Sequence, residues 1–213
     1  MTRKIETDSK GIPLKGAYLD QVPVIVFYTT MTTIFTCIAG FIANQAIVKS
    51  NEAAKVKISL VAENDLGYLY AALIVLKIGQ FLMASNAGNT RKYAKIHPPD
   101  QHVYQVKGAE GSKLGYVLMD YDGANGRFNR AQRAILNYQE IYPQTLAYIL
   151  ASGFVYPKEV FVLTTMFAIL RVVSALGYTA SVERRLMGFL GSNLVVSIME
   201  VLVGIIAYKT IFV

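Results

Sequence analysis

Four polar side chains recur at helical spacing in a part of the sequence that continues as an apolar segment. They are Arg130, Arg133, Asn137 and Glu140. The intervals of three, four and three residues place all four on one face of a helix. Guanidinium groups bind carboxylates through paired hydrogen bonds, and a carboxylate binds an ammonium group. This face therefore carries the groups needed to bind a small zwitterion that has carboxylates and an amine.

A second polar face occurs further along the chain. Its members are Arg171, Ser174, Tyr178, Ser181 and Arg185, at intervals of three, four, three and four residues. With a rise of about 1.5 Å per residue, Glu140 and Arg171 lie about 18 Å and 17 Å from the same end of two antiparallel helices. We therefore expect an ion pair between Glu140 and Arg171, in a pocket that opens toward the cytosol.

These faces must be positioned by helices that cross a membrane. The chain has 213 residues, of which 54% are hydrophobic and 16% charged, with a mean hydropathy of +0.38. A soluble domain has about 25% charged residues. Five apolar segments are long enough to span a bilayer, at 22–48, 66–85, 128–156, 160–182 and 186–208. The expected fold class is an all-α integral membrane protein.

The run from Phe128 to Glu140 resembles the F-x-R-x-x-R-A-x-x-N-x-x-E pattern of the MAPEG family, the membrane-associated proteins in eicosanoid and glutathione metabolism. Arg91-Lys92-Tyr93, followed by a proline pair at 98–99, is similar to the basic cluster after the first helix of that family. Gly177-Tyr178 and Arg184-Arg185 resemble positions of its third helix and the following turn. The resemblance begins near Leu66 and continues to the C-terminus.

The resemblance implies a four-helix bundle that assembles as a homotrimer and uses glutathione as co-substrate. Glutathione would bind between subunits near the cytosolic face. On the first helix face the implied ligands are Arg130, Arg133, Asn137 and Glu140, and on the facing helix they are Arg171 and Tyr178. Arg91 or Lys92 would reach in from the neighbouring subunit. Arg185, or Arg184 if the turn is shifted by one residue, would stabilise the thiolate.

The sequence predicts three regions. They are a cytosolic N-terminal segment at 1–21, an additional transmembrane helix at 22–48, and a MAPEG-like four-helix domain at 66–213 with a long cytosolic loop at 86–126. Basic residues gather in the first segment, in the long loop and at the Arg184-Arg185 turn, which places these on the cytosolic side. The net charge of +7 thus reflects topology, and we expect no nucleic-acid partner.

Two functions are compatible with these residues. The first is a glutathione-dependent transferase or peroxidase, in which a guanidinium favours the thiolate that attacks lipophilic substrates. The second is a non-catalytic scaffold or an accessory subunit of a larger membrane complex. Ser174 stands where relatives carry a tyrosine, and that difference, together with the extra helix, favours the second. The endoplasmic reticulum is the expected membrane, with a mitochondrial membrane as the alternative.

Other polar residues have simpler interpretations. Lys77 and Glu200 lie at comparable depth on two spans and are predicted to form a structural pair. His97 and His102 have poor spacing for a metal site, and the single cysteine, Cys37, lies in an apolar span. The glycine-rich stretch at 120–126 is predicted to be a turn before the third span rather than a calcium loop, because the distant glutamate ligand is missing. No metal is therefore expected.

Overall fold

The structure is a computed structural model that describes residues 6, 14, 22–48, 51–98, 100–108 and 115–212. Most of the segment predicted as cytosolic at 1–21 lies outside the described residues. The elements in chain order are α1 (Val24–Ala43) with the π-helical turn η1 (Asn44–Val48), α2 (Glu52–Glu63), α3 (Gly67–Tyr93), β1 (Tyr104–Gly108), β2 (Gly115–Met119), α4 (Gly123–Gly153), α5 (Pro157–Ala180), the 3-10 turn η2 (Glu183–Arg185) and α6 (Leu186–Phe212).

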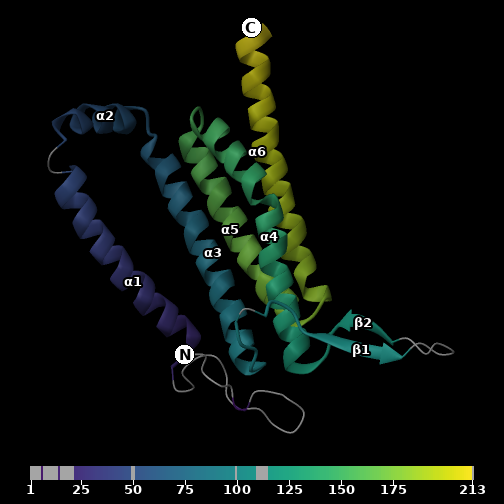
Figure 1. Cartoon of the computed structure of the whole chain (residues 1–213). Helices are drawn as coiled ribbons and strands as arrows, with labels where there is room; N and C mark the ends of the chain where they lie inside the picture. The colour runs from purple at the N-terminus through teal and green to yellow at the C-terminus, as the bar shows by residue number, and fades with distance from the viewer. Residues whose placement is uncertain are drawn as a thin grey trace.

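Four long helices form a bundle in which α5 packs against α3, α4 and α6 (Figure 1). The core between them is filled by large side chains with almost no exposed surface, such as Leu76, Tyr138, Phe167 and Met199. Small residues let the helices approach closely, as expected where lipid supplies no hydrophobic force between helices. A Cβ atom added at Gly79, for example, would lie 3.3 Å from the Cβ of Ala168. The predicted all-α membrane fold is confirmed.

Four helical segments of the described chain are long and apolar enough to cross a membrane: Val24–Val48, Gly67–Tyr93, Pro157–Ala180 and Glu183–Phe212. The third predicted span, at 128–156, corresponds to α4, which is not among them. It carries the polar face, and its 31 residues nevertheless pack against α3, α5 and α6. The bundle therefore packs one face of a charged helix against three apolar helices.

The start of α1, the β1–β2 hairpin and η2 all lie at one end of the bundle, and the C-terminus lies at the other (Figure 1). The described part of the long loop and the Arg184-Arg185 turn, two of the basic segments predicted to share one side of the membrane, therefore lie at the same end of the bundle. At the opposite end, Lys158 forms an ion pair with Asp65 at 2.7 Å, and its ammonium group lies 5.8 Å from the centre of the Tyr68 ring. This contact fastens the start of α5 to the turn before α3.

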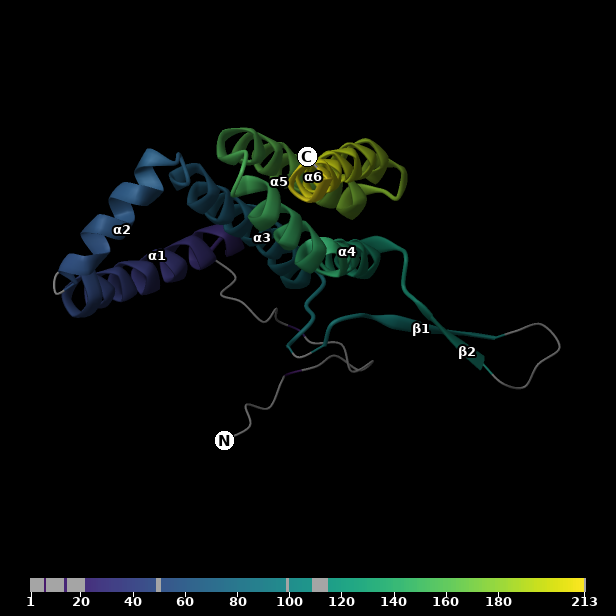
Figure 2. The same ribbon diagram turned by 90° about the horizontal axis from the view of Figure 1, so that it is seen from above.

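The first two helices extend away from the bundle (Figure 2). Near its start α1 packs on α3, where Val24 is buried and a Cβ atom added at Gly88 would lie 2.9 Å from Val24 and from Tyr28. The remainder of α1 exposes apolar side chains such as Phe35 and Phe41. The connecting helix α2 was not predicted. The Asn51 side chain caps it by accepting a hydrogen bond from the Ala54 N–H at 3.1 Å.

The long polar loop is shorter than predicted, because both flanking helices extend into it. Helix α3 continues past residue 85 to Tyr93, and α4 begins at Gly123 rather than near 128. Part of the remainder forms the antiparallel pair β1–β2, joined by residues outside the described chain. The buried Asn129 amide holds the hairpin to α4: it donates to the Val103 and Asp120 carbonyls and accepts from the Val103 N–H. The hydropathy pattern predicts a loop at these helix ends because the last part of α3 and the first part of α4 consist of polar residues beyond the apolar core.

The predicted pair between Lys77 and Glu200 is not formed. Both side chains are exposed, and no ion pair joins them within the described residues. Helix α6 packs on α4 and α5, so equal depth on two spans did not bring these side chains together. Of the stretch at 120–126 predicted to be a turn, residues 120–122 precede α4 and residues 123–126 form its first helical turn, and the Asp120 carboxylate accepts from the Asp122 N–H and the Asn125 amide. The described chain contains no group of three acidic, histidine or cysteine residues that could hold a metal ion.

Candidate functional site

The outer face of α4 carries an ion pair between Arg133 and Glu140. The Nη1 and Oε1 atoms are 3.3 Å apart, and the side chains are 45% and 58% exposed. The predicted ion pair between Glu140 and Arg171 is therefore wrong, because Glu140 points outward while Arg171 is buried. Arg133 and Glu140 lie two turns apart on one face of the helix, so each side chain is within reach of the other. The pair presents a cation and an anion to whatever covers α4.

The Arg171 side chain lies inside the bundle, only 5% exposed. Its Nη2 donates to the Asn193 side-chain oxygen of α6 at 3.1 Å, and its guanidinium lies against the rings of Phe167 and Phe189 at 5.5 Å and 5.6 Å. The Nε atom is buried and has no hydrogen-bond partner among the described residues. Sequence reasoning missed Asn193. The signal was a lone amide in an apolar span, which in a membrane usually faces a polar partner.

Five residues of the two predicted polar faces do meet at one small cavity of about 20 Å³. They are Asn137, Arg171, Ser174, Tyr178 and Arg185. This volume holds about one water molecule. A ligand the size of a tripeptide therefore does not fit in this cavity, and the members of the polar faces that are open to a larger ligand are exposed ones such as Arg133 and Glu140 on the outer face of α4.

The η2 turn holds the Arg185 side chain against the Tyr178 ring. The Arg185 guanidinium lies 4.9 Å from the centre of the Tyr178 ring, and the side chain is exposed. The Ser174 hydroxyl donates to the Arg185 carbonyl at 3.1 Å, so Ser174 anchors this turn. The neighbouring Arg184 is exposed, and its carbonyl lies 2.5 Å from where a Cβ of Gly177 would be. Only glycine fits there.

The Arg130 guanidinium is engaged with backbone carbonyls. Its Nε and Nη2 donate to the Tyr178 and Thr179 carbonyls at 3.1 Å and 3.3 Å, and its Nη1 donates to the Tyr121 carbonyl at 2.8 Å. A cation at the end of α5 offsets the partial negative charge of the last carbonyls. In this chain Arg130 ties the beginning of α4 to the end of α5, and three of its N–H donors are used by these contacts with backbone carbonyls.

The basic pair at the end of α3 makes contacts within its own chain. The Arg91 guanidinium lies 4.8 Å from the centre of the Phe128 ring, with a buried Nη1 that has no hydrogen-bond partner among the described residues. The Lys92 ammonium donates to the Val22 carbonyl at 3.2 Å and so fastens the start of α1. The expected contribution of either residue to a neighbouring subunit stays a prediction.

The height of the Arg133–Glu140 pair in the bundle limits what can cover it. The Tyr138 hydroxyl donates to the Leu76 carbonyl at 3.5 Å, which places this part of α4 beside the middle of α3. Charged side chains near the middle of a membrane face a cavity, a polar ligand or another protein, because hydrocarbon solvates them poorly. The exposed pair therefore requires a polar or protein partner on the outer face of α4.

The family of this chain follows from its similarity to known proteins. The model of the MAPEG family matches residues 68–205, which is more than half of the chain. The matched range begins within α3, after α1 and α2, and extends through most of α6. A comparison with curated protein sequences gave no match.

Proposed function

Because the chain belongs to the MAPEG family, we propose that it is a glutathione-dependent transferase or peroxidase acting on lipophilic electrophiles or lipid hydroperoxides at a membrane. The family is associated with glutathione and eicosanoid metabolism. The observation that carries the proposal is the outward-facing Arg133–Glu140 pair on a helix that packs within the bundle. A zwitterionic tripeptide would satisfy both charges at once, with a carboxylate on Arg133 and the ammonium on Glu140.

The residues present fit glutathione on the outer face of α4. Asn137 lies between the two charged residues on the same face and is half-buried, so its amide can bind a peptide group. The Arg185 guanidinium is exposed beside Tyr178, from where it can stabilise an anion. Bound glutathione would supply a thiolate for attack on a lipophilic electrophile or a hydroperoxide. Arg185 would favour the thiolate over the thiol through its positive charge.

The same geometry supports assembly of the subunits as a homotrimer. One chain supplies one wall of the proposed site, and the inner cavity of about 20 Å³ is too small to supply another. A neighbouring copy packed on the outer face of α4 would cover the ion pair and provide the second wall. The Arg91 and Lys92 side chains at the end of α3 are the basic groups proposed to reach a neighbouring site, and Arg184 is the alternative to Arg185.

Purified protein in detergent should bind glutathione in calorimetric titrations and conjugate it to a model electrophile. Enzyme-bound glutathione should show the absorbance of a thiolate near neutral pH. An Arg185→Ala variant is expected to lose that absorbance while it retains binding, because the cation acts on the sulfur rather than on the peptide. A thiolate signal that persists in the variant would remove Arg185 from the chemistry. If the protein did not bind glutathione at millimolar concentration, the proposed enzymatic function would be excluded.

The alternative is a non-catalytic member that serves as a scaffold or as an accessory subunit of a larger membrane complex. The exposed apolar surface of α1, which packs on its own bundle near its start, favours this alternative. Binding of glutathione without conjugation, together with co-purification of other membrane proteins, would support it. We further propose that the 128–143 run and Arg171-Val172 make the chain most like microsomal glutathione S-transferase 3, which would favour the enzymatic function. The proposed membrane is the endoplasmic reticulum, with a mitochondrial membrane as the alternative.

A further inference from the structure

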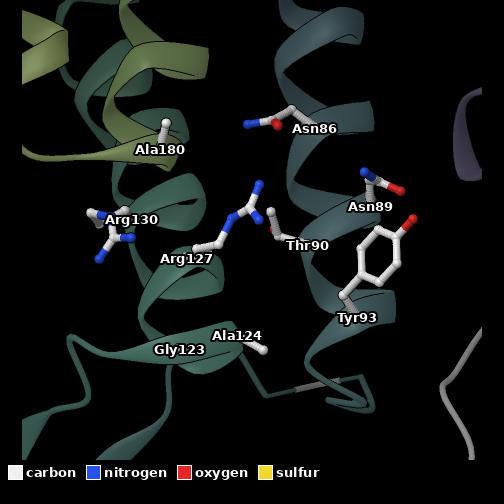
Figure 3. A pocket seen from close by; sticks show the side chains of 9 residues that line it. All are labelled: Asn86, Asn89, Thr90, Tyr93, Gly123, Ala124, Arg127, Arg130 and Ala180. Atoms are coloured by element: carbon white, nitrogen blue, oxygen red, sulfur yellow. The ribbon is translucent and has the colours of Figure 1, made fainter.

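A second cavity, of about 570 Å³, lies at the end of the bundle where α3 and α5 finish and α4 begins (Figure 3). Its volume is typical of sites for small molecules, which occupy about 300–1,000 Å³. The Arg133–Glu140 pair does not line it, so it is separate from the proposed glutathione site. Sequence patterns do not predict this cavity, because the lining residues come from three helix ends that are distant along the chain.

The cavity is positively charged. None of the described residues that line it is an aspartate or glutamate, and Arg127 extends from α4 toward α3 (Figure 3). Within the described part of the chain, no carboxylate forms an ion pair with Arg127. Arg130 also lines the cavity, and its contacts with the carbonyls at the end of α5 offset the partial negative charge of that helix end. The nearby Asp120 carboxylate is occupied by hydrogen bonds within its own turn.

Hydrogen-bond donors reach the cavity from two sides. The first residues of α4, Gly123 and Ala124, line it, and the N–H groups of a first helical turn have no partner within the helix. The side chain of Asp122 at the N-cap makes no capping hydrogen bond to them. Asn86, Asn89 and Tyr93 of α3 also line the cavity; in Figure 3 the Asn86 amide extends toward α4, whereas Asn89 and Tyr93 extend to the other side of α3. Asn86 is held in place by donating to the Thr179 hydroxyl at 2.8 Å.

From this combination we infer that the cavity binds the phosphate group of an anionic ligand. A phosphate monoester presents three acceptor oxygens on a tetrahedral centre. It can therefore accept from the Arg127 guanidinium and the α4 N–H groups on one side and from the α3 amides on the other. The cavity lies at the ends of two membrane-spanning helices, so the phosphate can belong to a lipid headgroup or to a soluble phosphate ester. The inference does not depend on glutathione binding.

The purified full-length chain in detergent should be titrated calorimetrically with dihexanoyl phosphatidic acid, dihexanoyl phosphatidylcholine and glycerol 3-phosphate. We expect phosphatidic acid to bind and phosphatidylcholine, whose phosphate is a diester covered by choline, to bind much more weakly. Comparable binding of glycerol 3-phosphate would identify a soluble ligand, and binding of phosphatidic acid alone would identify a lipid.

An Arg127→Gln variant is expected to weaken this binding about tenfold or more, because a charge-assisted hydrogen bond is lost. The matched control is Lys95→Gln, which removes one exposed positive charge just beyond α3 at a residue that does not line the cavity. Lys95→Gln should leave the affinity unchanged. Glutathione binding should be unchanged in Arg127→Gln, which separates failure at this site from failure at the outer face of α4.

The inference would be overturned if no phosphate ligand bound the wild-type chain, or if Arg127→Gln and Lys95→Gln weakened binding equally. The second result would mean that general electrostatic attraction explains the affinity. If circular dichroism showed that Arg127→Gln does not fold, Asn89→Leu would decide. This substitution removes an exposed amide from the cavity wall and leaves the charge unchanged, and an unaltered affinity in it would also exclude the site.

Discussion

An Arg133→Gln variant is expected to bind glutathione about 100-fold more weakly than the wild-type chain. A guanidinium that binds a carboxylate through two charge-assisted hydrogen bonds contributes about 3 kcal/mol, and each 1.4 kcal/mol corresponds to about tenfold in affinity. The variant would also leave the Glu140 carboxylate without the partner that lies 3.3 Å away. Calorimetric titration of the detergent-solubilised protein measures the dissociation constant directly.

Two further variants test whether the effect belongs to the polar face. Gln139→Ala changes an exposed residue next to Glu140 on a different side of α4, and it should bind glutathione like the wild-type chain. Arg133→Lys keeps the charge and loses the planar fork, so its affinity should fall between those of wild type and Arg133→Gln. Equal affinities for wild type and Arg133→Gln would show that α4 does not bind the carboxylates.

A Gly188→Ala variant is expected to unfold at a temperature lower by about 5 °C, because α6 crosses α5 in backbone contact at this residue. A Cβ atom at Gly188 would lie 2.6 Å from the Leu170 carbonyl oxygen and 2.7 Å from the Ser174 nitrogen. Neither backbone atom can move without shifting a helix, and overpacking of this kind costs about 1–3 kcal/mol. Thermal unfolding followed by far-ultraviolet circular dichroism gives the midpoint.

Gly204→Ala on the same helix is the matched control. No atom lies within 4 Å of a Cβ added at Gly204, so the substitution should leave the midpoint unchanged or raise it, since alanine favours a helix over glycine. If both glycine variants melted at the wild-type temperature, the close crossing of α5 and α6 would be incorrect. The Gly188→Ala change should also weaken the thiolate signal, because it displaces the η2 turn that carries Arg185.

The Gly188 contact also explains the serine at position 174. Helix α6 begins so close to α5 that the Ser174 Cα would lie 2.9 Å from a Cβ at Gly188. The Ser174 hydroxyl then donates to the Arg185 carbonyl. In this chain a short polar side chain positions the arginine turn.

The sequence by itself determined the long helices of the bundle and their polar faces. Intervals of three and four residues placed Arg133, Asn137 and Glu140 on one side of α4, because a helix fixes the direction of each side chain from its position alone. The hydropathy of the sequence predicted the membrane spans. The positions of the basic segments predicted which helix ends lie on the same side. The Arg-Asn-Glu pattern gave the family, which the match over residues 68–205 confirmed.

Only the tertiary structure decided which polar groups meet. Glu140 and Arg171 lie at similar depth, yet the rotation of α4 turns Glu140 outward to Arg133 while Arg171 faces Asn193 inside the bundle. Arg130 belongs to the same sequence motif but binds the end of α5, and the cavity beside Arg127 exists because three helix ends diverge. Periodicity specifies the face of a helix, whereas the rotation of that face toward a neighbour depends on packing between segments far apart in the chain.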